Sequence, residues 1–269
     1  MRMTVFAVPF GSVLALAVAA PALAQDFEAT TRIEQSADDT GDWEVELGAA
    51  ATAVPDFPGS DSLQLLPLPY FYIEYKDKWF AHPTSGVGYY FVNEGNNFVS
   101  TSLTYLTGRQ EDEAAALTGL GDLDGGIAAR AAAQFDMTYF VLGGFIAHQL
   151  SGDDTGTEAT LYATTRIKPT EQFRIYPTVR VTYADDERNQ AFFGVTPQQA
   201  AASFYPVYTP DGGLKSYGFQ LQALYDVTDE WRIAGQATLD ILQDDVADSP
   251  IVQDENQYIF SLGVIRDFN

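Results

Sequence analysis

The sequence contains no cysteine and only two histidines, His82 and His148. Without thiols the chain can form no disulfide, no zinc-thiolate or iron–sulfur centre and no cysteine nucleophile. Two histidines are too few for a metal site built from several imidazole groups. We therefore expect a fold that closes on itself without covalent or metal cross-links.

Basic residues are scarce as well. The chain has 14 Lys and Arg residues against 37 Asp and Glu residues, which gives a formal net charge of −23. Nucleic-acid binding depends on Lys and Arg side chains that neutralise phosphates, so this charge balance excludes that class of function. An acidic surface of this kind is ordinary for a protein exposed outside the cell.

Long apolar runs are confined to the first residues. The run Val5–Ala20 follows a single positive charge, and a small-residue cleavage pattern, Ala22-Leu23-Ala24, follows the run. These features predict a cleaved signal peptide over residues 1–24. The alternative is a membrane anchor, which needs about 20 consecutive apolar residues. The polar stretch 25–42 is predicted to be a mobile periplasmic lead.

Beyond residue 42 the dominant pattern is alternation between apolar and polar residues. From Phe173 to Tyr183 the odd-numbered residues are apolar and the even-numbered residues are mostly polar. Successive side chains of a strand point to opposite faces, so this segment predicts a strand with one apolar face. The same alternation recurs in the segments that begin at Trp43, Ala159, Tyr217 and Trp231.

These alternating segments are long enough to cross a bilayer. A tilted transmembrane strand needs about 9–11 residues, whereas strands of soluble proteins commonly have about five or six. Because every backbone group in lipid must be paired, we predict an all-β fold, a closed antiparallel transmembrane β-barrel over residues 43–269. The alternative is a soluble β-sandwich, whose strands would be shorter.

The number of strands follows from the connections. Ten strands are predicted, near residues 43–53, 64–75, 97–108, 124–136, 138–150, 156–168, 171–184, 214–227, 230–242 and 256–268. Outer-membrane barrels place short turns in the periplasm and long loops outside, and periplasmic chain ends require an even number of strands. Splitting the segment Lys78–Val92 at His82–Gly86 adds two strands and places every long loop outside. We therefore predict twelve strands, with ten as the alternative.

Two prolines interrupt one predicted strand. Pro67 and Pro69 lie in the strand 64–75, although proline cannot donate a hydrogen bond to a neighbouring strand. The two residues have the same parity, so both missing donors face the same side. We interpret them as marking a locally opened seam or a bulge.

Several segments outside the alternation carry a family resemblance. They are Pro55–Asp61 leading into Leu66–Phe71, Gly119–Gly126, Phe192–Pro197 and Ala247–Val252. In this order they resemble the MltA-interacting protein family (MipA/OmpV), from Trp43 to the end of the chain. The resemblance implies a Gram-negative outer-membrane protein in contact with membrane lipid and lipopolysaccharide. It also implies a scaffold that links a lytic transglycosylase to a bifunctional murein synthase in cell-wall turnover, and it supplies no catalytic residues.

Charged residues on the polar faces would point into the barrel. They are Arg130, Arg166, Arg174, Arg180 and Arg232, with Glu44, Glu46, Glu74, Glu158 and Asp240. Buried charges need partners, so the mixed signs favour a network of ion pairs that fills a narrow lumen. The functional alternative is a narrow channel or solute-uptake path lined by the same residues.

One short segment contains the residue types of a hydrolase. His148 and Ser151 are followed by Asp153 and Asp154, and an outer-membrane hydrolase could use a Ser/His/acid arrangement. A histidine near a serine is commonplace, so we predict no enzyme activity from this segment.

The expected loops are rich in aspartate, which could bind calcium or the divalent ions that bridge lipopolysaccharide. These residues are Asp122, Asp124, Asp153, Asp154, Asp185, Asp186, Asp244, Asp245, Asp248 and Asp254. The segment Asp122–Gly125 begins like a calcium loop but lacks the closing glutamate, because residue 133 is alanine. Solvated acidic loops are therefore the favoured interpretation, and we assign no catalytic, cofactor-binding or metal-binding residue.

Overall fold

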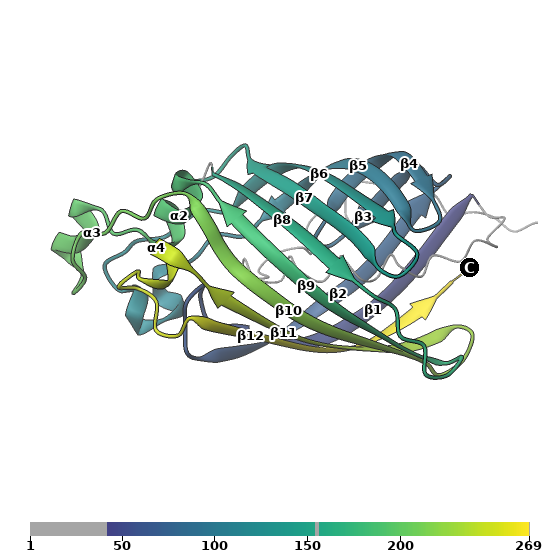
Figure 1. The fold of residues 1–269 in the computed structure, drawn as a ribbon. Helices are drawn as coiled ribbons and strands as arrows, with labels where there is room; N and C mark the ends of the chain where they lie inside the picture. The colour runs from purple at the N-terminus through teal and green to yellow at the C-terminus, as the bar shows by residue number, and fades with distance from the viewer. Residues whose placement is uncertain (1–41, 154–155, 269) are drawn as a thin grey trace, which may run out of the picture.

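The computed structural model describes residues 42–153 and 156–268, and within them the chain forms a closed antiparallel barrel of twelve strands (Figure 1). The strands are β1 (Trp43–Pro55), β2 (Leu63–Tyr75), β3 (Trp79–His82), β4 (Gly86–Glu94), β5 (Asn97–Leu106), β6 (Gly126–Asp136), β7 (Val141–Gln149), β8 (Thr157–Thr164), β9 (Phe173–Ala184), β10 (Gly213–Asp226), β11 (Trp231–Leu242) and β12 (Asn256–Asp267). Each strand pairs with its neighbour in sequence, and β1 closes the barrel by pairing with β12. The predicted fold class and the count of twelve are confirmed. The predicted signal peptide and all of the periplasmic lead except Asp42 lie outside the described residues.

The predicted alternation sorts side chains between the inside and the outside of the barrel. In β9 the even-numbered Tyr176 and Thr178 are buried inside, whereas Val179 and Tyr183 are exposed on the outside. Large apolar side chains cover the outward faces of other strands too, as with Leu161, which is 64% exposed. An outward apolar band of this kind matches the hydrocarbon region of a bilayer.

The two ends of the barrel differ, and Figure 1 shows the helices gathered at one of them. The end that we call the turn end has the connections 76–78, 95–96, 137–140, 165–172 and 227–230. The opposite end, the loop end, has the connections 56–62, 107–125, 150–156, 185–212 and 243–255. Because outer-membrane barrels keep their short turns in the periplasm, the turn end is the periplasmic side.

The loops at the loop end carry short helices. They are η3 (Glu111–Glu113), η4 (Ala115–Leu117), α2 (Asp186–Phe193), α3 (Pro197–Ala202) and α4 (Asp244–Ala247). Across residues 42–153 and 156–268, none of the helices has the length and apolarity needed to cross a membrane.

Two predicted strand boundaries differ from the structure by three or more residues. The predicted strand 156–168 ends at Thr164, because regular pairing with β9 stops there and only an isolated bridge between Ile167 and Ile175 follows. Arg166 therefore lies exposed in a turn-end connection instead of inside the barrel. The predicted strand 138–150 begins at Val141, since Thr138 has a positive φ of 73° and belongs to the turn.

The split of segment Lys78–Val92 is confirmed, and it leaves an interruption in the barrel wall. β3 has only four residues, so β2 pairs with it only through Ile73–Tyr75. Along its other edge β2 pairs with β1 over its full length, without a bulge. The remaining residues of β2, 63–72, have no strand partner on the β3 side among the described residues. We call this interruption the seam.

Pro67 and Pro69 face the seam. The amide of Lys76 donates to the carbonyl of Asp42 at the start of β1, so the even-numbered backbone groups of β2 point towards β1. Odd-numbered groups point the other way, because the direction alternates along a strand. The donors that the two prolines lack would therefore point at the edge where no strand receives them. The interpretation that the prolines mark a seam is confirmed, and the pairing of β2 with β1 contains no bulge.

A glycine in β10 makes room for an ion pair that spans three strands. Gly218 lies between Arg180 of β9 and Asp240 of β11 in the strand register. The guanidinium of Arg180 reaches over Gly218, and its Nε donates to Asp240 Oδ1 at 3.0 Å. A Cβ atom at residue 218 would lie 2.3 Å from Arg180 Cγ and 2.4 Å from Asp240 Oδ1. A side chain at this position would displace the ion pair.

We predict that Gly218→Ala lowers the free energy of unfolding by about 1–3 kcal/mol, because the new methyl group forces Arg180 and Asp240 apart. The midpoint of thermal unfolding in detergent micelles measures this effect. Gly235→Ala is the matched control, since the nearest atom to its Cβ would be Leu262 Cδ1 at 3.9 Å. Equal midpoints for the two variants would contradict the account.

Candidate functional site

A chain of ion pairs runs along the inner wall of the barrel near the turn end, from β9 to β1. Arg174 Nη2 donates to both carboxylate oxygens of Asp226 at 2.6 Å. Arg232 Nε donates to Asp226 at 3.1 Å, and its Nη1 donates to Glu46 at 3.2 Å. The hydroxyl of Tyr70 donates to the other oxygen of Glu46 at 2.9 Å. These contacts connect five strands and balance the two positive charges with two negative ones.

A second set of inward charges lies nearer the loop end. Arg180 pairs with Asp240, as described above. Glu158 of β8 accepts from Lys215 Nζ at 2.5 Å and lies 3.8 Å from Arg188 Nε of helix α2. Glu158 therefore ties a loop helix to the barrel wall.

The remaining predicted luminal charges also contact other side chains. The guanidinium of Arg130 stacks 4.4 Å from the ring centre of Phe145, a cation–π contact. Glu74 accepts from Asn93 Nδ2 at 2.8 Å and from the hydroxyl of Tyr72. In the strand register Glu44 lies opposite Glu74. The structure thus supports the ion-pair interpretation for Arg174, Arg180, Arg232, Glu46, Glu158 and Asp240, whereas Arg166 lies in a turn-end connection.

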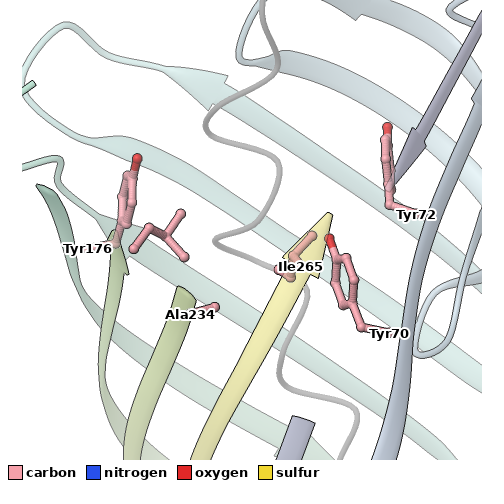
Figure 2. Close-up of a cluster of buried hydrophobic side chains, with 6 residues drawn as sticks. Tyr70, Tyr72, Tyr176, Ala234 and Ile265 are labelled. Atoms are coloured by element: carbon pink, nitrogen blue, oxygen red, sulfur yellow. The ribbon is translucent and has the colours of Figure 1, made fainter. Parts of the chain in front are cut away.

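Between the two sets of charges, the lumen contains an apolar cluster. Its buried members are Tyr70, Tyr72, Tyr176, Leu224, Ala234 and Ile265. Figure 2 shows the labelled members of this luminal cluster on β2, β9, β11 and β12, pointing into the space that the strands enclose. The interior of a transmembrane barrel is usually polar, so an apolar cluster inside the barrel is unexpected.

The loops at the loop end share a hydrophobic core. Phe57, Leu117, Leu120, Val195 and Ile251 are all buried against one another, although they come from four different connections. A second cluster joins Phe192 and Phe193 of α2 to Leu242 and Val246. We call these packed loops the loop cap. Loops that bury a common core hold one arrangement over the barrel mouth.

One charged side chain is buried in the loop cap. Arg109 is 1% exposed, and its Nη1 donates to the carbonyl of Phe192 at 3.1 Å. Burial lowers the pKa of Arg109 to about 10, while the nearby carboxylate of Glu113 opposes the shift. At neutral pH the guanidinium therefore remains protonated, a fixed positive charge beneath an acidic surface. No pattern in the sequence marked this residue.

The residues of the considered hydrolase arrangement do not come together. His148 lies on the outward face of β7, where its Nδ1 is 3.0 Å from Thr157 Oγ1. The hydroxyl of Ser151 accepts from the amide of Ile127 at 2.9 Å. Asp153 accepts from the amide of Asp124 at 2.8 Å. Asp154 lies outside the described residues.

The described loop aspartates mostly accept hydrogen bonds from nearby backbone. Asp122 accepts from the amide of Glu111 at 2.8 Å, and Asp185 accepts from the amides of Arg188 and Thr157. Within residues 42–153 and 156–268, no three His, Cys, Asp or Glu side chains are grouped so that they could hold a metal ion. These carboxylates therefore act as caps and turn-formers in the described loops.

The luminal cluster and the loop cap were missed by sequence reasoning. For the cluster a signal exists: Leu224 and Ala234 fall on the inward parity of strands that otherwise place Gln222 and Gln236 inside. The sequence contains no comparable signal for the loop cap, because its residues are far apart in sequence and show no periodic spacing.

Comparison with known proteins gives a consistent family. The profile of the family described as MltA-interacting protein MipA matches residues 47–268. The chain is 28% identical over 94 residues to the MltA-interacting protein of Escherichia coli (strain K12), which covers 35% of this chain and 38% of that protein. It is 29% identical over 94 residues to outer membrane protein OmpV of Vibrio cholerae, which covers 35% and 36%. These alignments therefore span less than half of each relative.

Two outer-membrane proteins of solved structure align with most of the chain. An outer membrane channel from Pseudomonas putida F1 aligns with 87% of this chain and 100% of its own, at 10% identity and a TM-score of 0.46. The outer-membrane expressed OmpT of Vibrio cholerae aligns with 87% of this chain and 100% of its own, at 8% identity and a TM-score of 0.38.

We predict that Phe57→Ala loosens the loop cap without unfolding the barrel, because it empties a buried site at a cost of about 3–5 kcal/mol. Proteinase K added to intact cells should then cleave the loops of the variant faster. Phe204→Ala is the control, since Phe204 is 100% exposed and supports no core. Unchanged resistance of Phe57→Ala would show that the shared core does not hold the loops.

Proposed function

Since the chain belongs to the MltA-interacting protein MipA family, we propose that it docks a lytic transglycosylase of the MltA type at the periplasmic side of the outer membrane. A bifunctional murein synthase is the second partner in the proposed assembly. The protein itself resides in the outer membrane, as its barrel and its relatives indicate. The proposal assigns it a scaffolding role in cell-wall turnover and no reaction of its own.

The ion pairs inside the barrel and the loop cap over its mouth favour a docking role over the passage of hydrated solutes. Ion pairs bridge non-adjacent strands along the inner wall, as with Arg232 on β11 and Glu46 on β1, and the loop cap packs over the outer mouth. Breaking a partly buried pair to admit a hydrated ion is costly. The alternative of a narrow channel for hydrated solutes is therefore the less favoured one.

The turn end offers the surface for a periplasmic partner. The β6–β7 connection exposes Met137, Tyr139 and Phe140, and Tyr139 is 85% exposed. Two hydrogen bonds hold this connection in place. The amide of Met137 donates to the carbonyl of Phe140, and Thr165 Oγ1 donates to the carbonyl of Tyr139 at 2.9 Å. Exposed aromatic side chains on a rigid turn are typical anchors of protein interfaces. This aromatic turn is the observation in the structure that carries the docking proposal.

We predict that a photoreactive amino acid at position 139 crosslinks to a lytic transglycosylase in intact cells, identified by mass spectrometry. The same amino acid at position 204 is the control, because Phe204 lies in a loop on the opposite side of the membrane. Recovery of the transglycosylase from position 139 alone is the expected result. Recovery of only lipopolysaccharide and barrel-assembly proteins from both positions would contradict docking at the turn end.

A substitution separates docking from folding. Tyr139→Ser should weaken recovery of the transglycosylase by about tenfold or more, as expected when an interface anchor is removed. Thermal unfolding of the barrel should stay unchanged, since this side chain is exposed. Val227→Ser, which introduces the same residue at an exposed apolar position of another turn-end connection, serves as the matched substitution.

A further inference from the structure

The seam lies in the half of the wall nearer the loop end. One side of it is β2 from Leu63 to Tyr72. The other side is the β3–β4 turn at 83–85 together with the end of β5, which pairs with β4 only as far as Leu103. Thr104 Oγ1 donates to the carbonyl of Thr84 at 2.8 Å and holds this turn against β5. In a barrel whose loops face outward, the seam borders the outer leaflet.

The edge of β2 at the seam is unsuited to an added strand. The backbone groups that face the seam belong to Leu65, Pro67, Pro69 and Phe71, and the two prolines have no amide hydrogen. Prolines on an exposed edge block pairing with another chain. A partner that uses backbone hydrogen bonds is therefore disfavoured, whereas a ligand without a peptide backbone is not.

Both faces of β2 are apolar along the seam. Leu65 and Pro67 are exposed on the outside, while Leu66 and Leu68 have the inward parity. Tyr70 and Tyr72, next on the inward side, belong to the luminal cluster (Figure 2). An apolar surface thus runs from the lipid-facing wall, through the seam, to the inside of the barrel.

Polar atoms without protein partners lie along the same path. His82 faces inward at the foot of the seam, with its ring centre 5.7 Å from that of Tyr70. Within the described part of the chain, His82 Nε2, Ser85 Oγ and both amide atoms of Gln222 are buried and have no hydrogen-bond partner. Gln222 lies on β10, away from the seam, and is beside Tyr176 of the luminal cluster in the strand register. Buried polar groups usually have partners, so His82 Nε2 and Ser85 Oγ at the seam indicate a place for a ligand's polar group.

We propose that the barrel binds a single-chain amphiphile from the outer leaflet, with its alkyl chain passing through the seam onto the luminal cluster. The polar head of the amphiphile lies at the seam, where it receives a hydrogen bond from Ser85 or donates one to His82 Nε2. This site is independent of the docking surface at the turn end, because the two use different ends of the barrel.

A photolabelling experiment tests the site. The full barrel is placed in lipid nanodiscs with a fatty acid that carries a diazirine at the end of its chain, and the labelled residues are mapped by mass spectrometry. The expected result is labelling of the inward residues Leu68, Leu224 and Ile265. Labelling confined to outward residues such as Leu65 and Leu262 would overturn the proposal, because that is the pattern of ordinary lipid contact.

A pair of substitutions in β2 provides the control. Leu68→Asn places an amide on the inward path and should lower labelling of Leu224 and Ile265 by about fivefold. Leu65→Asn makes the same change on the outward face of the same strand and should leave that labelling unchanged. Equal effects of the two variants would contradict an inward path, and heat-dependent mobility on gels confirms that each variant is folded.

Competition keeps the test valid if Leu68→Asn does not fold. Excess unlabelled fatty acid should abolish labelling of the inward residues in the unmodified barrel, because a site of limited capacity can be saturated. Labelling of outward residues should persist. Inward labelling that resists competition would overturn the proposal.

Discussion

The pairing of backbone amides and carbonyls around a closed ring of strands is the constraint on which the rest of this structure depends. In lipid an unpaired backbone group has no water to replace its partner, so the wall must close. Closure through β1 and β12 leaves the side chains to divide between an apolar outside and an enclosed inside. Every charge placed inside must then find a partner within the same narrow space.

The inside of the barrel meets this requirement by reaching across strands. Arg180 passes over Gly218 to Asp240, and Arg232 passes from β11 to Glu46 on β1. Such contacts tie non-adjacent strands together in addition to the backbone ladder. The wall is weakest where the short β3 ends, and there two prolines and the apolar faces of β2 replace the missing ladder. The proposed partner surface lies at the turn end, and the proposed ligand site lies at the seam.

The apolar–polar alternation and the turn-forming residues predicted most of the fold, because both are properties of residues close together in sequence. The alternation of apolar and polar residues located β9, and the turn-forming residues Pro83–Gly86 located the β3–β4 turn. The residue at which strand pairing stops depends on the neighbouring strand. The alternation continues beyond the end of β8, and the prediction therefore placed Arg166 inside the barrel, which is wrong. Contacts between distant residues, such as Phe57 with Ile251, leave no local trace. The inward Leu224 was readable as an apolar residue on a polar face, but its cluster depends on the closed ring.

Residue-resolved amide hydrogen exchange in β2 tests most directly whether the closed wall is interrupted at one seam. The account predicts rapid exchange at Leu65 and Phe71, whose amides face the seam, and slow exchange at Leu66 and Leu68, whose amides pair with β1. Equal protection of all four amides would contradict it, because the edge of β2 would then be paired on both sides.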